Sequence, residues 1–349
     1  MKTREERWGD VRLEDEDQRY SHLRVLDLAT KTTRTLTRGR FVVGGYDWSP
    51  DGTRIAFDHR VTSDPADGGS SDISIVDVKT GAVTLLVTQE GPDNQPRWSP
   101  DGTRIAFVSA MAKPSHLYEN GEIAVIAAAG GPIEALTQAF DEDPSLVAWT
   151  PDGILFSAAQ RTYSALFTLD PSSRAISRHQ ANDTDCVAVL THGGRADGGL
   201  RRLRAHGISG RLRRSGACAH LGASCQRHAR ADVRWPAHTR EVVRWKSQDG
   251  AEIEGVLHKP ANFEAGTRYP LLVVIHGGPT GVSRPVPYGS ASFYPIDAFL
   301  SRGALVLEPN YRGSAGYGEK FRALNVRNLG IGDAWDALRH RRAGGAGAR

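Results

Sequence analysis

The sequence predicts a partial β-propeller followed by an α/β domain, and three observations carry this prediction. The phrase Trp-Ser-Pro-Asp-Gly-Thr-Arg-Ile-Ala-Phe occupies residues 48–57 and recurs unchanged at residues 98–107. A shorter version, Trp-Thr-Pro-Asp-Gly-Ile-Leu-Phe, begins at Trp149, so the three tryptophans are separated by 50 and then 51 residues. Later in the chain, the apolar run 271–275 ends in His-Gly-Gly, which is typical of a buried strand leading into a tight turn.

The repeats predict the strands of the propeller. A fixed period of about 50 residues indicates a repeat architecture. In the Ser-Pro-Asp-Gly unit, proline fixes φ, aspartate caps the turn with its own side chain, and glycine accepts a positive φ. Short strands separated by turns every ~8–12 residues are typical of four-stranded propeller blades. We expect strands at 55–57, 73–78, 83–87, 105–107 and 123–126.

The propeller is expected to be incomplete over residues 1–185. Residues 24–37 have the pattern of a blade but lack the Trp-Ser-Pro-Asp-Gly unit. About three and a half blades are therefore predicted, whereas propellers typically have about four to eight. Each repeated tryptophan has two interpretations, a platform on which a ligand stacks or an aromatic residue packed between blades, and we favour packing.

Patterned sequence resumes at about residue 239 and predicts a second domain. Gln248-Asp249-Gly250 between two apolar runs is a strong hairpin signal. The elements expected after residue 239 are a hairpin (242–245 and 253–258), buried strands (271–275 and 304–307), a short helix (319–325) and a helix from Ala334 capped by Asp333.

Composition excludes several classes of protein. The chain of 349 residues is 39% hydrophobic and 24% charged, which is ordinary for a soluble globular protein with room for two domains. No apolar run approaches the ~18 residues of a membrane span. The charge-dense residues 1–17 contain no apolar signal region, so we expect a cytoplasmic protein without membrane association. Three cysteines, Cys186, Cys218 and Cys225, are an odd count and form no disulfide framework.

The net charge of +4 arises from two arginine-rich segments. Residues 195–234 contain ten arginines and two aspartates, and residues 339–349 contain four arginines and no acid. These segments contribute +8 and +4, so the rest of the chain carries −8 and is acidic. The Arg/Ala/Gly-rich segment 186–238 has no period of two or 3.6 residues. We expect it to be disordered, because it cannot bury enough apolar surface to offset its ordering entropy.

Three interpretations of the arginine-rich segments remain open. A basic arm that binds nucleic acid would need aromatic residues among the arginines, and only Trp235 is near. A zinc site would use Cys218, His220, Cys225 and His228, but their spacing fits no standard finger. We favour translation of GC-rich DNA in a shifted frame, because Arg, Ala, Gly and His dominate and the patterned sequence stops and resumes abruptly. That interpretation implies neither a nucleic-acid partner nor a metal.

An ordered set of motifs resembles the prolyl oligopeptidase family of serine peptidases, in particular its acylaminoacyl-peptidase and dipeptidyl-peptidase members. After the propeller repeats and the Asp-Gly hairpin come His-Gly-Gly-Pro (276–279), Asn-Tyr-Arg-Gly-Ser-x-Gly-Tyr-Gly (310–318) and Gly-Ile-Gly-Asp (330–333). The resemblance covers about 1–185 and 240–338. It implies a partial β-propeller followed by the N-terminal part of an α/β-hydrolase (peptidase) domain at 239–338. It also implies acyl transfer by Ser, Asp and His on short peptides, with no cofactor.

The resemblance assigns roles to a few residues. His276, Gly277 and Gly278 match the turn whose backbone N–H groups hold an oxyanion, although the two glycines would also serve a plain tight turn. Tyr311 and Arg312 match a family hallmark, and we expect them to scaffold their loop rather than touch substrate. Residues 313–318 resemble a phosphate-binding loop only loosely, because they lack the Gly-x-Gly-x-x-Gly pattern and no Lys-Ser/Thr follows.

The nucleophile that the family uses is missing from these 349 residues. No serine has glycines two places before and after it, as Gly-x-Ser-x-Gly requires; Ser314 and Ser224 each have only one of the two. The residues after Leu338 contain no serine or aspartate, and His340 is no credible triad member. We therefore expect a truncated peptidase with negligible activity and none of the triad. The alternative is a non-catalytic propeller fragment that binds a peptide or a protein.

Overall fold

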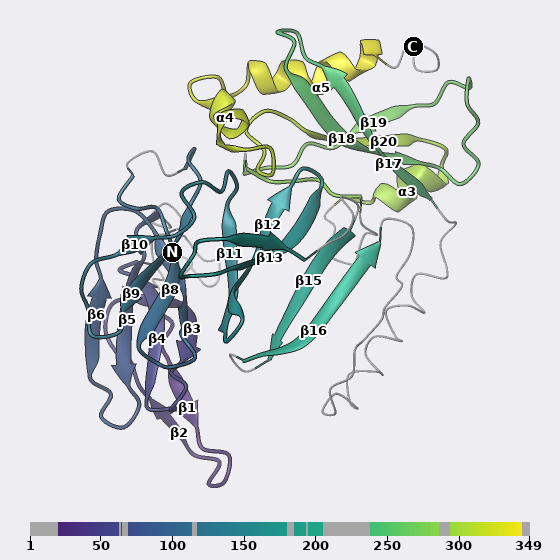
Figure 1. Cartoon of the computed structure of the whole chain (residues 1–349). Helices are drawn as coiled ribbons and strands as arrows, with labels where there is room; N and C mark the ends of the chain where they lie inside the picture. Colours follow the sequence, from purple (N-terminus) through teal and green to yellow (C-terminus); the bar gives the residue numbers. More distant parts are fainter. Residues whose placement is uncertain are drawn as a thin grey trace, which may run out of the picture. The chain divides into compact units, whose positions relative to one another are not determined.

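A computed structural model describes residues 20–62, 64, 69–113, 117–179, 185–192, 195–204, 238–278, 280–285 and 294–343 (Figure 1). The chain forms two compact units. The first comprises Met1–Pro114 with Glu122–Leu136, and the second comprises Ser115–Gly121 with Thr137–Arg349. None of the helices in the described part of the chain is long and apolar enough to cross a membrane.

The first unit consists of a hairpin and two four-stranded antiparallel sheets. The hairpin pairs β1 (Arg24–Leu26) with β2 (Thr33–Thr35). The first sheet has the order β3 (Val42–Trp48), β4 (Arg54–Arg60), β5 (Asp72–Asp77) and β6 (Val83–Val87). The second sheet has the order β7 (Asp93–Trp98), β8 (Arg104–Ser109), β9 (Glu122–Ala127) and β10 (Glu134–Ala135). Each sheet thus contains one copy of the ten-residue phrase.

The repeated phrase forms the link between the first two strands of each sheet. In the first copy, Asp51 Oδ1 accepts hydrogen bonds from the Thr53 N–H at 3.0 Å and the Ser49 hydroxyl at 2.6 Å. Asp101 makes the same two bonds in the second copy, at 3.0 and 2.5 Å. The glycines of the two copies have φ of +71° and +70°. The same sequence gives the same turn because side-chain caps and glycine freedom act locally.

The apolar residues after each turn build the core of the first unit. Phe57 and Phe107 are fully buried, and Trp98 is buried in a cluster with residues of both sheets. The Arg54 guanidinium lies 4.7 Å above the Trp98 ring, and the Trp98 backbone N–H donates to Asp47 at 2.8 Å. Burial raises the pKa of Asp47 to about 6. Trp98 therefore packs between the two sheets.

The second unit contains a third four-stranded antiparallel sheet. Its order is β11 (Pro144–Thr150), β12 (Gly153–Gln160), β13 (Tyr163–Leu169) and β14 (Ile176–Arg178), with Trp149 in β11. Phe156 and Phe167 stack with ring centroids 5.1 Å apart, and Phe140 meets both rings edge-on. This aromatic group packs the segment before β11 onto the sheet.

A two-stranded hairpin follows the third sheet. It pairs β15 (Asp185–His192) with β16 (Arg195–Arg204) and lies largely within the segment 186–238, for which we expected disorder. The run Cys-Val-Ala-Val-Leu at 186–190 favours extended backbone whatever the charge around it. The disorder expected of the segment as a whole stays a prediction, and residues 205–237 lie outside the described part of the chain. The proposed zinc ligands Cys218, His220, Cys225 and His228, and Ser224, lie outside the described residues.

The last sheet of the second unit is mixed, with the order β17-β18-β20-β19. β17 (Thr239–Lys246) and β18 (Glu252–Lys259) form the predicted hairpin. β20 (Leu305–Asn310) runs antiparallel to β18 and parallel to β19 (Leu271–Val273). The helix α3 (Ile296–Ser301) packs on this parallel pair through a buried apolar cluster. The segments that follow β19 and β20 therefore leave the sheet at the same edge.

Two boundaries differ from the sequence-based expectation. β19 is shorter than the apolar run 271–275, because Ile275 is already half exposed. After α4 (Glu319–Arg322) and the 3-10 helix η4 (Ala323–Asn325), the helix α5 (Gly332–Ala343) begins one residue before Asp333. Asp333 thus lies in the first turn, where a carboxylate favours the helix dipole. The helix continues into the 339–349 tail, where Ala and Arg are good helix formers.

Candidate active-site turn and the surrounding loop

The turn after β19 places His276, Gly277 and Gly278 at the carboxyl edge of the parallel pair. Gly278 has a φ of +123°, and a Cβ on it would lie 2.9 Å from the backbone nitrogen of Thr280. A Cβ on Gly281 would lie 2.7 Å from the Gly277 carbonyl oxygen. Both positions therefore require glycine. Gly277 is different, because nothing lies within 4 Å of the position a Cβ would take. The backbone at Gly277 is open to the approach of another group.

The loop after β20 holds the His276 end of this turn. The Tyr311 hydroxyl donates to the His276 carbonyl oxygen at 2.7 Å, and the two rings stack with centroids 4.6 Å apart. The Ser314 hydroxyl lies 3.1 Å from His276 Nε2 and donates to the Tyr311 carbonyl at 2.6 Å. The backbone and the imidazole of His276 are thus both fixed by one loop, which orients the turn before any ligand arrives.

Ser314 and His276 do not form a nucleophile and its base. The Ser314 hydroxyl already donates to the Tyr311 carbonyl at 2.6 Å. His276 Nδ1 lies 3.2 Å from the Gly277 carbonyl oxygen, with which only a protonated nitrogen can bond. Serine and histidine thus each have a backbone partner of their own. Burial also lowers the pKa of His276, which favours the neutral imidazole. Ser314 is fully buried, so no substrate carbonyl reaches its hydroxyl.

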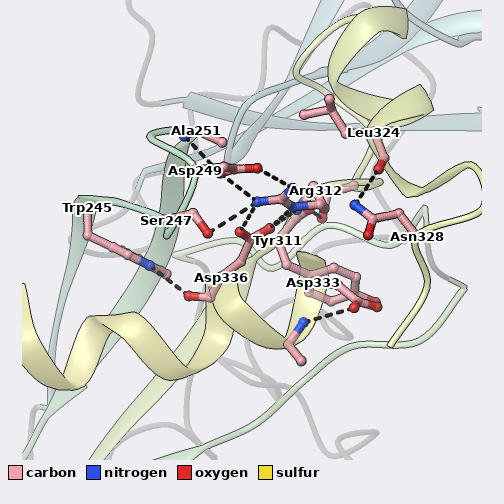
Figure 2. Close-up of polar contacts among 12 residues, drawn as sticks. Trp245, Ser247, Asp249, Ala251, Tyr311, Arg312, Leu324, Asn328, Asp333 and Asp336 are labelled. Atoms are coloured by element: carbon pink, nitrogen blue, oxygen red, sulfur yellow. Dashed lines mark hydrogen bonds and ion pairs between the residues drawn. The ribbon is translucent and has the colours of Figure 1, made fainter. Parts of the chain in front are cut away.

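Arg312 ties three elements together beneath this loop (Figure 2). Its guanidinium donates to both Asp336 oxygens, at 2.9 and 2.7 Å, and to both Asp249 oxygens, at 2.7 and 3.0 Å. A further bond reaches the Ser247 hydroxyl at 3.2 Å, and the Arg312 backbone N–H also donates to Asp336. Ser247 and Asp249 belong to the β17–β18 turn, and Asp336 belongs to α5. Arg312 therefore connects the hairpin, the end of β20 and the helix.

The two buried charges of this network are matched, and the second carboxylate, Asp249, is partly exposed. Arg312 is 2% exposed and Asp336 fully buried, so each compensates the other inside the protein. The hydrogen bonds from Arg312 lower the pKa of Asp249 to about 2, and its acidic partners raise the pKa of Arg312. Gly332 lets this packing happen, because a Cβ there would lie 2.7 Å from Arg312 Nη1. The network positions the loop, and its side chains are buried apart from that of Asp249.

The third sheet contacts the same loop through the acidic triplet, Asp141-Glu142-Asp143, which precedes β11. Asp141 Oδ1 accepts hydrogen bonds from the Glu319 backbone N–H at 2.8 Å and from the Asn120 amide at 3.2 Å. Asp143 forms an ion pair with Arg322 of α4. The triplet and the start of α4 are therefore joined by direct polar contacts within the second unit.

Glu142 occupies the glycine-rich loop that resembles a phosphate cradle. The backbone N–H groups of Gly316 and Gly318 bond to its carboxyl group, and both glycines have φ near +80° to +90°. Burial, with smaller effects from Asp141 and Asp143, nevertheless raises the pKa of Glu142 to about 8. Backbone N–H groups arranged in this way bind anions. The loop here uses them to hold a carboxyl group of its own chain.

A cavity of about 590 Å³ lies beside Glu142. Residues of the third sheet and its preceding segment line it together with residues of β17, β18 and the 316–318 loop. Its charged and aromatic lining comprises Phe140, Asp141, Glu142, Arg161, Tyr163, Arg178, Arg244, Glu254 and Tyr317. A volume of this size suits a small ligand or a short peptide.

Most residues of this cavity lie outside the motifs found in the sequence, and only Gly316, Tyr317 and Gly318 belong to one. Glu142, Arg161 and Glu254 belong to no motif and become neighbours only through the fold. The one available signal was the run Asp-Glu-Asp just before a strand, since a strand entry is an unusual place for three consecutive acids. Among the described residues, no group of three or more His, Cys, Asp or Glu side chains is arranged to hold a metal ion.

Comparison with known proteins agrees with this architecture. The model of the TolB β-propeller domain (PD40) matches residues 11–194, which is more than half of the chain. Dipeptidyl-peptidase 5 of Trichophyton tonsurans is 26% identical over 312 residues, covering 79% of this chain and 40% of that protein. The uncharacterized peptidase YuxL of Bacillus subtilis is 37% identical over 81 residues, covering 23% of this chain and 12% of that protein.

A solved structure shares the fold. The acylaminoacyl peptidase of Pyrococcus horikoshii superposes with a TM-score of 0.58 at 17% identity, over 91% of this chain and 58% of that one. A propeller followed by a mixed α/β sheet is thus an architecture of known peptidases. The chain belongs to the TolB β-propeller family, and these matches confirm its predicted relation to the prolyl oligopeptidase peptidases. It spans about 40% of the length of the dipeptidyl-peptidase relative.

Proposed function

We propose that this chain carries the oxyanion turn and part of the peptide-binding surface of a serine-type peptidase that hydrolyses short peptides by acyl transfer. We also propose that the 349 residues alone do not turn over substrate. The observation that supports the first part is the turn at His276, Gly277 and Gly278. The turn follows a parallel strand and has free space beside Gly277. The Tyr311 hydroxyl fixes it through a hydrogen bond to the His276 carbonyl.

The chemistry follows from that geometry. When a nucleophile adds to a peptide carbonyl, negative charge develops on the carbonyl oxygen. Backbone N–H groups that are already aimed at that oxygen stabilise it without reorganising. In this chain Tyr311 and Ser314 fix His276 from one side. The tight backbone at Gly278 and Gly281 closes the other side. We assign to Tyr311 and Arg312 the role of scaffolding residues, because their side-chain polar groups already make hydrogen bonds within the protein.

The second part of the proposal rests on the absence of Gly-x-Ser-x-Gly from the 349 residues. The serine nearest to the turn, Ser314, is buried and committed to the backbone. Loss of a nucleophile in a serine peptidase lowers turnover by up to about 10⁶-fold, and an oxyanion site alone retains only about 10³–10⁴ over water. The expected activity of this polypeptide is therefore negligible.

The test is hydrolysis of an acyl-peptide p-nitroanilide by the purified chain. We expect no release of p-nitroaniline above the buffer rate, with an active serine peptidase as the positive control. Release that a serine-directed phosphonate abolishes would refute the claim that the chain is inactive.

The alternative function is a propeller module that binds a peptide or protein and has no link to hydrolysis. One observation favours this alternative: the cavity beside the acidic triplet is a recessed polar surface. Titration with a peptide phosphinate, whose tetrahedral phosphorus carries an anionic oxygen without reacting with a serine, separates the two. Binding that perturbs the amide signals of Gly277 and Gly278 supports the peptidase, and peptide binding without that perturbation supports the module.

A further inference from the structure

The cavity beside the acidic triplet contains carboxyl groups that are already engaged. Glu254 of β18 is 3% exposed and accepts from the Tyr317 hydroxyl, Arg161 and Arg244. Asp141 accepts from the backbone of Glu319, and Glu142 from the 316–318 loop. The negative charge of these acids is therefore already partly compensated, which makes them weaker partners for an incoming cation.

Two arginines of the cavity, Arg161 and Arg244, are in the opposite situation. Arg161 stands in the turn between β12 and β13, and Arg244 on β17. Their side chains are 58% and 66% exposed. Among the described residues, the side chain of each makes one long contact, to the shared Glu254, at 3.4 and 3.5 Å. A guanidinium has five N–H donors, so most of the donors of both groups remain available.

The charge of the lining points the same way. Arg161, Arg178 and Arg244 carry three positive charges, and Asp141 and Glu254 carry two negative charges. Burial raises the pKa of Glu142 to about 8, so at neutral pH it adds little negative charge. The lining then has a net positive charge, and planar guanidinium groups match the geometry of a carboxylate.

We propose that the cavity binds the free carboxylate of a short peptide. This carboxylate accepts hydrogen bonds from Arg161 and Arg244 and competes with Glu254 for them. The peptide part of this inference rests on the proposed function. The carboxylate part rests on the two half-exposed arginines alone. A carboxylate can come from the C-terminus of a peptide or from an acidic side chain, and the inference commits to the C-terminus. A C-terminal carboxylate enters a recess of this size at the end of an extended chain.

The experiment is isothermal titration calorimetry of the full chain at pH 6.5 and low salt with three probes. N-acetyl-trialanine carries only a C-terminal carboxylate, its carboxamide carries no charge, and N-acetyl-Ala-Glu-Ala-amide carries only a side-chain carboxylate. We expect N-acetyl-trialanine to bind at least tenfold more tightly than either of the others. If the carboxamide binds as tightly as N-acetyl-trialanine, the cavity does not recognise a carboxylate, although it still binds a peptide. Equal or tighter binding by the glutamate probe overturns the C-terminal assignment.

Variants locate the site. Arg161→Gln is expected to weaken N-acetyl-trialanine about tenfold without changing the carboxamide, while Arg302→Gln on the exposed end of α3 changes neither. Arg161→Gln and Arg244→Gln each leave the buried Glu254 with one partner fewer, so a folding defect is a risk in both. Glu254→Gln covers that risk, because removing the internal competitor should tighten N-acetyl-trialanine several-fold. Unchanged affinity in both Arg161→Gln and Glu254→Gln overturns the proposal. Failure of all three probes to bind overturns it together with the peptide-binding part of the proposed function.

Discussion

The Arg312 network makes a sharp prediction about stability. Replacing Arg312 with methionine keeps much of the volume of the side chain but removes all five donors. Asp336, which is fully buried, is then left without its guanidinium, and Asp249 and Ser247 lose their partner. Breaking a buried ion pair by removing one partner typically costs about 3–5 kcal/mol. We expect Arg312→Met to lower the free energy of unfolding of the second unit by that amount.

The matched controls follow from exposure. Asp249 is 43% exposed on its side chain, so water replaces its partner when the contact is lost. Asp249→Asn should therefore cost about 1 kcal/mol or less. Removing both buried charges with Arg312→Met and Asp336→Leu should recover part of the loss, because no uncompensated charge remains. The order of stability is thus wild type, Asp249→Asn, the double variant and Arg312→Met.

The assay is urea unfolding of the full chain followed by tryptophan fluorescence and by hydrogen exchange of α5. Trp245 donates its indole N–H to the Asp336 carbonyl at 2.8 Å, so its environment reports on the same network. Hydrogen exchange assigns the transition to the second unit. An Arg312→Met chain within about 0.5 kcal/mol of wild type would refute the reasoning, as would an Asp249→Asn chain that loses as much as Arg312→Met.

Three further predictions test other contacts. Burial against the 316–318 loop raises the pKa of Glu142 from 4.5 to about 8, so the buried carboxyl group holds its proton more tightly than an exposed one. The contact with the loop should therefore weaken as pH rises from about 5 to 9. Hydrogen exchange corrected for the intrinsic pH dependence measures this, and Glu142→Gln should remove the pH effect. Gly278→Ala should destabilise the chain by about 1–3 kcal/mol, more than Gly266→Ala, because a Cβ at Gly278 meets the backbone and one at Gly266 meets nothing within 4 Å. Tyr311→Phe should cost about 1 kcal/mol in urea unfolding by removing the bond to the His276 carbonyl.

Local patterns account for what the sequence predicted well. The Ser-Pro-Asp-Gly turns are set by residues within five positions of one another, so two identical copies fold identically. The hairpin around Asp249 was predictable for the same reason, because Asp-Gly between apolar runs selects a tight turn. The turn at His276 was predictable from its own three residues and from the apolar strand before it, and its oxyanion role stays a proposal.

Contacts between segments that are distant in the chain could not be predicted from the sequence. Glu142 and Gly316 are far apart in the chain and meet only because the third sheet and the mixed sheet share one compact unit. Arg161 and Arg244 converge on Glu254 for the same reason, and neither arginine stands in a recognisable motif. The hairpin β15–β16 was not predicted, because the arginine-rich composition around the short apolar run at 186–190 favours disorder. Sequence pattern thus located the turn, and the fold alone located the cavity beside it.

We propose that this chain, which is related to known peptidases, retains a turn that stabilises an oxyanion and contains no competent serine. The most direct measurement is the intact mass of the purified 349-residue chain after exposure to a fluorophosphonate. We predict an unchanged mass under conditions that label an active serine peptidase completely. Addition of a single phosphonyl group to any serine of the folded chain, with no addition to a heat-denatured sample, would contradict the claim.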